Sequence, residues 1–341
     1  MTTITQEGTA IALRIVNPNP VFDRTVTVPR VSPGAVIRAQ SAELTCGGKG
    51  INVARALRSL GSPALLVLPV GARDRATYES LLDAEALSAE IIPVAGGVRT
   101  ATILLESETD RVTVVNEAGE FEDPAQWPQV VDSVVSATEP GDLVLVMGSL
   151  PVGLAPNALV DLVAGVHARG ARVLVDTAPM WLEPVLAVAP DVVTPNLDEA
   201  EACLGLADAH VMDSHSLADD EARERAELAS RRLVERGATL ALVTAGGAGV
   251  AVATSQACAW VSAVAVDVVS TVGAGDSFVA GFAYVWQQSF DIADVVEAVR
   301  SGVASAAASC EQVLAGGVSR ERYAQLLAQV PHAIVATGVA S

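Results

Sequence analysis

The chain of 341 residues has few aromatic side chains, cysteines and histidines. Aromatic residues make up 4% of it, although 51% of its residues are hydrophobic, so its core must be built from Ala, Val and Leu. Side chains of that size suit helices packed tightly on a parallel sheet. The four cysteines are far apart and the four histidines are scattered, which argues against a disulfide framework or a structural zinc site.

Long apolar runs and an excess of basic residues are also missing. No apolar stretch reaches membrane length, and residues 1–10 lack the basic start and apolar run of a secretion signal. The formal net charge of −19 argues against nucleic acid or an anionic membrane as a partner. We therefore expect a cytoplasmic protein that binds neither. In so acidic a chain, an isolated Lys or Arg beside glycines is informative.

A glycine-rich turn at residues 270–278, with the sequence STVGAGDSF, organises the rest of the chain. The apolar run 263–269 before it suggests a strand, and residues 278–286 after it suggest a buried helix. Unpaired N–H groups at a helix N-terminus attract anions. Asp276 has two interpretations here. It is either an ordinary helix cap or a general base beside an anion hole formed by the N–H groups of Gly273, Ala274 and Gly275.

A second glycine turn, Cys46-Gly47-Gly48-Lys49-Gly50, also leads into a helix. Apolar residues recur at helical spacing over 53–60, and Gly61 ends the pattern. Asn52 lies in the first turn of this helix. The spacing differs from that of a P-loop, so the nucleotide motif with that name is excluded.

Elsewhere, apolar segments end in small or polar residues, as strands of an open α/β sheet do where ligands bind. We expect such strands at 13–16, 64–70, 91–94, 142–147, 172–175, 191–193 and 240–243, and helices at 80–87 and 219–236. Residues 100–106 and 111–116 predict a hairpin. The chain is therefore expected to form one α/β domain over 1–341, with a mostly parallel central sheet, helices on both faces and a small β-lid from about 24–45 and 97–118.

Taken together, these motifs resemble the PfkB family of sugar kinases, which has a ribokinase-like fold. The two signatures are 47–55 and 270–278, and between them GSLP at 148–151, PNxxE at 195–199 and TxGxxG at 244–249 follow in the family's order. Five agreeing motifs are highly specific. The opening motif 19–25 is similar to that of 1-phosphofructokinases and tagatose-6-phosphate kinases.

The resemblance implies a role for each matching position. Asp276 is the catalytic base, with Gly273, Ala274 and Gly275 as the anion hole. The sugar and its phosphate are assigned to Asp23, Arg38, Gly47, Gly48, Lys49, Asn52, Arg99 and Ser149. ATP is assigned to Asn196, Glu199, Thr244, Gly246, Gly249 and Ser270. No residue is assigned as a direct metal ligand, because Mg²⁺ is implied to be held by the ATP phosphates and by water near Asn196 and Glu199.

Three positions depart from the family pattern and leave the sugar open: Thr194 replaces a frequent lysine, Ala101 a common asparagine and Met147 a frequent serine. The expected function is ATP-dependent phosphorylation of a phosphorylated ketohexose, with fructose 1-phosphate preferred. Tagatose 6-phosphate and fructose 6-phosphate are alternatives. Two further hypotheses remain: a kinase of an unphosphorylated sugar or nucleoside, and a catalytically silent sugar-phosphate sensor. Exposed strand edges in the lid suggest a homodimer formed through it.

Overall fold

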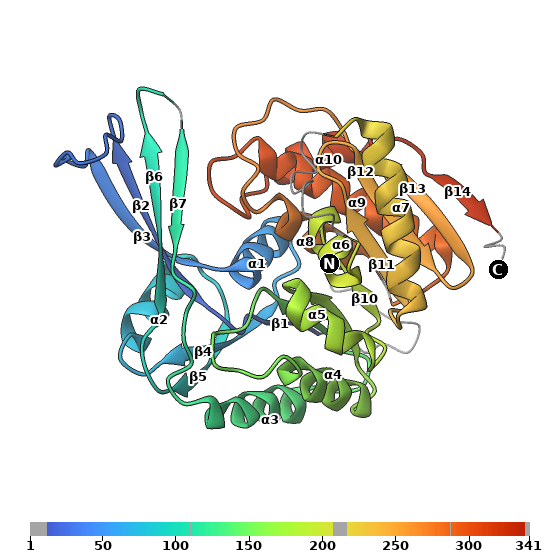
Figure 1. Cartoon of the computed structure of the whole chain (residues 1–341), viewed down its shortest axis with the longest axis horizontal. Coiled ribbons are helices and arrows are strands. Elements are labelled where there is room, and N and C mark those ends of the chain that lie inside the picture. The colour runs from blue at the N-terminus through green and yellow to red at the C-terminus, as the bar shows by residue number, and fades with distance from the viewer. Residues whose placement is uncertain (1–11, 110, 207–216, 287, 338–341) are drawn as a thin grey trace.

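The computed structural model describes residues 12–109, 111–206, 217–286 and 288–337. Figure 1 shows a large body from which a small sheet projects on one side. The body is built on a ten-stranded sheet in the order β14-β13-β12-β11-β10-β9-β8-β1-β4-β5. Its strands are β1 (Leu13–Val16), β4 (Leu65–Gly71), β5 (Ala89–Val94), β8 (Leu143–Met147), β9 (Arg172–Asp176), β10 (Val192–Val193), β11 (Leu240–Thr244), β12 (Gly249–Thr254), β13 (Ala257–Ser262) and β14 (Ile334–Thr337).

The sheet is parallel from β5 through to β11 and antiparallel beyond it. Alternate residues of a strand point to opposite faces. In β8, Leu143, Leu145 and Met147 enter one hydrophobic core, whereas Val144 and Val146 enter the other. The two faces are therefore covered separately, as the α/β prediction requires.

In the described part of the chain, five helices cover each face, because each buries one apolar side against the sheet. One core is closed by α1 (Lys49–Leu60), α2 (Arg75–Ala84), α8 (Ala274–Val285), α9 (Ile292–Cys310) and α10 (Arg320–Leu327). The other is closed by α3 (Trp127–Ala137), α4 (Ala158–Ala168), α5 (Pro179–Leu186), α6 (Leu197–Leu204) and α7 (Asp219–Glu235). A short 3₁₀ helix, η1 (Pro124–Gln126), precedes α3. The predicted fold class is confirmed.

The small sheet has the order β3-β2-β6-β7 and contains the predicted hairpin. Its strands are β2 (Val21–Val28), β3 (Ser41–Gly47), β6 (Arg99–Glu106) and β7 (Val112–Asn116). Only four residues separate the end of β1 from the start of β2, so this sheet is tied directly to the edge of the large sheet where β1 finishes (Figure 1). Its use as a lid stays a prediction.

Two local predictions were wrong, and one lies largely outside the described residues. Residues 263–269 form no strand, because the chain turns at residues 245–248 just before β12 begins at Gly249 opposite Ser262. Beyond that pair, among the described residues, only the Ala263 N–H still bonds to the backbone preceding β12, at Ala248 O, 3.3 Å away. The helix expected at 80–87 instead spans Arg75–Ala84, and it buries Tyr78 fully. The sequence of residues 1–12 predicts a loose leader, and all of these residues except residue 12 lie outside the described part of the chain. Among the described helices, none combines the length and apolar character needed to cross a membrane.

Candidate active site

Asp276 lies in the first turn of α8, with its side chain turned into the protein. It is 6% exposed, and its Oδ2 accepts a hydrogen bond from Asn52 Nδ2 at 2.8 Å. The cap of this helix is Gly273, at φ 78°, and no side chain caps it, so the interpretation of Asp276 as a helix cap is wrong. Burial raises the pKa of the Asp276 carboxyl to about 7, against the opposing charge of Lys49 and the hydrogen bond from Asn52. A carboxyl with that pKa can accept a proton near neutral pH.

The turn before α8 offers N–H groups to an anion, but not all three that were expected. The Ala274 N–H donates to Thr271 O at 3.2 Å and is therefore engaged in the turn itself. Within the described chain no acceptor is found for the N–H groups of Gly273, Gly275 and Asp276. These three donors lie at the positive end of the helix dipole. The arrangement suits a transferring phosphoryl group beside Asp276.

Lys49 brings a positive charge to the same place, and two carboxylates hold it. Its Nζ is 2.6 Å from Asp176 Oδ1 and 3.6 Å from Glu199 Oε1. Burial opposes the charged form, but these carboxylates raise the pKa of Lys49 above its ordinary value. Burial also raises the pKa of Glu199, which Lys49 partly offsets. Asp276, Asp176 and Glu199 thus share one lysine.

The first glycine turn is shaped by close contacts with neighbouring side chains. A Cβ on Gly47 would overlap the Asp23 carboxylate, and one on Gly48 would lie 2.9 Å from Asn17 Nδ2. Gly48 also has φ 110°, a conformation that favours glycine. Burial raises the pKa of Asp23, against the charges of Arg55 and Arg99. The turn therefore presents bare backbone beside the half-buried Asp23 carboxylate, which suits the close approach of a sugar.

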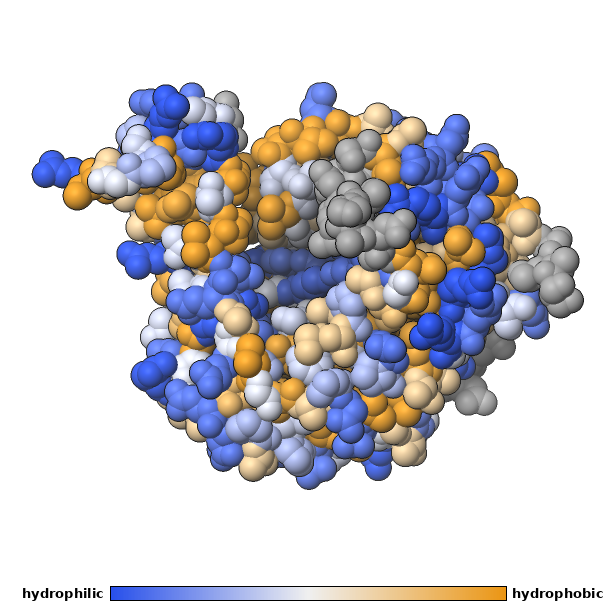
Figure 2. All heavy atoms as spheres, in the orientation of Figure 1, coloured by the Kyte–Doolittle hydropathy of each residue, from blue (hydrophilic) through white to orange (hydrophobic). Residues whose placement is uncertain are grey.

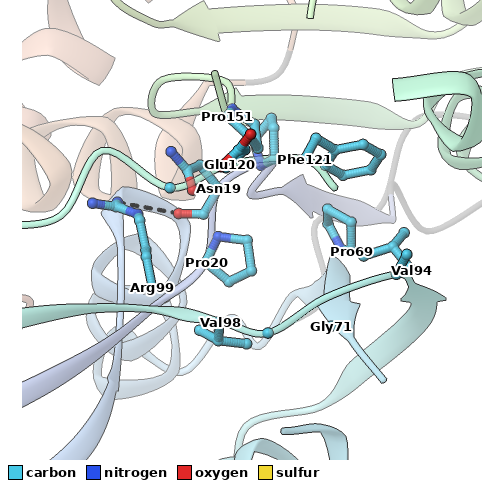
Figure 3. A pocket seen from close by; sticks show the side chains of 14 residues that line it. Asn19, Pro20, Pro69, Gly71, Val94, Val98, Arg99, Glu120, Phe121 and Pro151 are labelled. Atoms are coloured by element: carbon cyan, nitrogen blue, oxygen red, sulfur yellow. Dashed lines mark hydrogen bonds between the residues drawn. The ribbon is translucent and has the colours of Figure 1, made fainter. Parts of the chain in front are cut away.

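Arg99 braces the base of the small sheet. Its guanidinium donates to Asn116 Oδ1 at 2.6 Å, Glu117 O at 2.9 Å and Asn19 O at 3.2 Å. Figure 3 shows Arg99 reaching Asn19 beside a pocket that Pro20 and Phe121 also line. The pocket holds about 30 Å³, room for about one water molecule. It is too small for a sugar phosphate and is separate from the Asp276 cluster.

The residues assigned to ATP lie at the carboxyl ends of neighbouring strands. Asn196 and Glu199 cap α6 reciprocally, with Asn196 Oδ1 accepting from the Glu199 N–H at 2.8 Å and Glu199 Oε2 from the Asn196 N–H at 3.1 Å. Asn196 also bridges to Thr244 at the end of β11. Gly246 and Gly249, both at positive φ, form the turn that follows. These five positions are therefore brought together.

The remaining predicted positions are less well connected. Ser149 follows Gly148, whose Cβ position lies 3.7 Å from Lys49 Cβ, so it is near the cluster. Ser270 accepts a hydrogen bond from the Val272 N–H at 3.2 Å and shapes the anion turn. Arg38 is exposed in the loop between β2 and β3, and it makes no hydrogen bond or ion pair within the described chain. Its place near a substrate phosphate stays a prediction.

Sequence reasoning gave no role at the site to three residues that help to build it. Asn17 Oδ1 accepts from the Gly50 N–H at 3.0 Å, while its Nδ2 is buried without a partner. From the sequence Asp176 looks like a residue that simply satisfies a turn, yet its Oδ1 accepts a hydrogen bond from Lys49 Nζ. Arg55 Nη1 donates a hydrogen bond to Asn52 Oδ1 at 3.1 Å. The positions of Asn17 and Asp176, each directly at a strand end, were the available signal.

A hollow lies between the small sheet and the body, and its visible floor is hydrophilic (Figure 2). Within the described residues, no group of three or more His, Cys, Asp or Glu side chains is arranged to hold a metal ion. Asn196 and Glu199 nevertheless suit a magnesium ion held through water, because carboxylate and amide oxygens are the ligands that this ion prefers.

Comparison with known proteins identifies the family. Residues 17–321 match the model of the pfkB family carbohydrate kinases. The 1-phosphofructokinase of Xanthomonas campestris pv. campestris is 34% identical over 78% of this chain and 81% of its own, and that of Rhodobacter capsulatus is 32% identical over 83% and 87%. The structure of phosphofructokinase-2 from Escherichia coli in complex with potassium has a TM-score of 0.83 at 24% identity, over 94% of this chain and 99% of that one. The chain belongs to the pfkB family of carbohydrate kinases.

Proposed function

We propose that this kinase transfers the γ-phosphoryl group of ATP to a hydroxyl of fructose 1-phosphate, giving fructose 1,6-bisphosphate. The observation that carries the proposal is the buried Asp276 beside free N–H groups at the start of α8. The relatives named above are 1-phosphofructokinases, which favours fructose 1-phosphate and disfavours both the unphosphorylated substrate and the silent sensor.

In this mechanism the residues of the chain hold the hydroxyl and take its proton. Asp23 binds sugar hydroxyls beside the bare backbone of Gly47 and Gly48, while Asp276 accepts the proton of the attacking hydroxyl. Because the attacking hydroxyl becomes acidic only late in a loose phosphoryl-transfer transition state, positioning and charge stabilisation matter more than proton removal. The N–H groups of Gly273 and Gly275 supply that stabilisation without adding a charge.

Magnesium enters the proposal with the nucleotide. Asn196 and Glu199 would meet it through water, and Thr244, Gly246 and Gly249 would line the nucleotide beside them. When bound, the ion neutralises charge on the ATP phosphates. The cations assigned to the sugar phosphate are Lys49, Arg99 and Arg38, with Ser149 as a hydroxyl donor.

The test is ADP release from MgATP with fructose 1-phosphate, fructose 6-phosphate, tagatose 6-phosphate, fructose and ribose in parallel. We expect fructose 1-phosphate to give the highest kcat/KM. If fructose 6-phosphate or tagatose 6-phosphate gave the highest kcat/KM instead, the substrate would change, but the enzyme would still be a kinase of a phosphorylated ketohexose. Equal rates with free fructose would overturn the phosphate site, and Arg99→Ala would then leave kcat/KM nearly unchanged.

We also propose a homodimer formed through the small sheet. Every residue of β7 is exposed, and Val112, Val114 and Val115 are 53%, 49% and 59% exposed. Exposed strand edges and apolar side chains favour pairing with another chain. Light scattering at micromolar concentration tests this, and Val114→Lys should shift the distribution toward monomer. A monomeric wild-type protein would refute it.

A further inference from the structure

Arg55 is a buried cation behind the candidate site, on α1. It is 4% exposed, and its guanidinium donates to both carboxylate oxygens of Glu85. Nε lies 2.5 Å from Glu85 Oε2, and Nη2 lies 2.7 Å from Glu85 Oε1. Two further bonds point toward the site: Nη2 donates to Cys46 O at 2.6 Å and Nη1 to Asn52 Oδ1 at 3.1 Å. A charge this buried needs such partners. Arg55 thus links α2 with the glycine turn and with Asn52.

The bond to Asn52 decides which way its amide faces. An asparagine side chain has one acceptor oxygen and one donor NH₂ group. Because the guanidinium can only donate, Oδ1 must face Arg55, and Nδ2 is left to donate to Asp276 Oδ2 at 2.8 Å. The reversed amide would set its oxygen against a carboxylate and its NH₂ against a cation. Only a fork-shaped donor spans Glu85, Cys46 O and Asn52 at once.

We propose that Arg55, held by Glu85, is a positioning residue that fixes the Asn52 amide with its NH₂ toward the carboxylate of Asp276. The inference rests on the proposed function, because it takes Asp276 as the base. Neither Arg55 nor Glu85 need touch the substrate. They act on Asp276 only by fixing the orientation of the Asn52 side-chain amide.

The expected consequence is a change in how readily Asp276 gains a proton. Besides burial, the groups acting on it are Lys49, Asp176 and Glu199 through charge, and Asn52 through its hydrogen bond. A donor to the ionised form favours that form. Once the amide is free to turn, its oxygen can instead accept from protonated Asp276. The acid limb of the kcat/KM profile should then move to higher pH.

The experiment is the pH profile of kcat/KM for the best sugar phosphate, from about pH 5 to 9, which reports groups of the free enzyme. The variant is Arg55→Met with Glu85→Gln, which removes both charges of the ion pair and therefore leaves no buried charge without its partner. We expect the acid limb to move up by about one pH unit. In an Asn52→Ala background the same double change should cause no further movement.

The matched control removes another partly buried ion pair, Arg14 with Asp142, in which Nε and Oδ2 are 3.2 Å apart. It lies at the amino-terminal ends of the parallel strands β1 and β8, whereas the candidate site lies at the carboxyl ends of the strands. Arg14→Met with Asp142→Asn should leave the acid limb in place. If the Arg55 variant does not fold, Arg55→Lys keeps the charge beside Glu85 but cannot span three acceptors, and it should show the same movement.

Two results overturn the inference: an unmoved acid limb in the folded Arg55 variants, or an equal movement in the Asn52→Ala background. Failure of the proposed function is distinct from both, because then Asp276→Asn would retain turnover.

Discussion

Replacing Asp276 by asparagine should make the protein more stable while it removes turnover. The carboxyl is buried, and its pKa is about 7 in the folded protein against 3.8 for an ordinary Asp. The folded state therefore prefers the protonated form, and ionisation opposes folding. Asparagine has nearly the same shape and still offers Asn52 an acceptor oxygen, but it carries no charge.

The pH dependence follows from the raised pKa. Stability from this group is fully present below about pH 4 and is lost as the pH rises to about 7. The difference of about three pH units corresponds to about 4 kcal/mol in the free energy of unfolding at pH 8, at about 1.4 kcal/mol per unit. At pH 4 the wild type and Asp276→Asn should be almost equally stable.

Urea denaturation at the two pH values measures this, together with turnover at pH 8. Asp132→Asn, which removes an exposed carboxyl on α3, serves as the control and should change stability by no more than about 0.5 kcal/mol at either pH. Turnover of Asp276→Asn should fall by at least about 10²-fold. An equal effect on stability at pH 4 and pH 8 would refute the argument from burial, and retained turnover would refute the assignment of the base.

Two further predictions test the charge and the shape of the site. Lys49→Met removes the charge that lowers the pKa of Asp276, so we expect the acid limb of kcat/KM to move to higher pH. The change also leaves Asp176 and Glu199 without their cation. Because the lysine is partly exposed, the free energy of unfolding at pH 8 should fall by only about 1–2 kcal/mol. Urea denaturation of the double variant with Asp176→Asn should show part of that stability regained, and no recovery would contradict the pairing. Gly47→Ala places a methyl group against the Asp23 carboxylate, so KM for the sugar phosphate should rise at least about tenfold, with little change in KM for ATP. Equal changes in both would indicate general distortion.

The layered fold and most of the site were accessible from the sequence because both follow from local rules. Continuous apolar runs such as 65–71 and 143–147 are typical of strands buried on both faces. Glycine turns leading into α1 and α8 predicted where anions would bind. Such signals need no knowledge of distant contacts.

What the sequence did not show depends on pairs far apart in the chain. Lys49 meets Asp176 across 127 positions, and Asn52 meets Asp276 across 224. The position of Asp176 at the end of β9 is the local signal for a place near the site, but nothing local shows that Asp176 holds Lys49. The failed strand at 263–269 has the same origin, because pairing depends on where β12 begins and not on the apolar run itself.

Several unfavourable features of the described chain lie around the candidate site. Asp276 is buried with a raised pKa, Asn17 Nδ2 and Ser277 Oγ are buried without partners, and helix N–H groups at the start of α8 have no acceptor. Each of these features costs stability in the absence of a ligand. A bound phosphorylated substrate would offer acceptors to the unpaired donors and a proton to the carboxylate. The structure thus retains a locally destabilised region where the proposed chemistry takes place, which is the pattern expected when function outweighs stability.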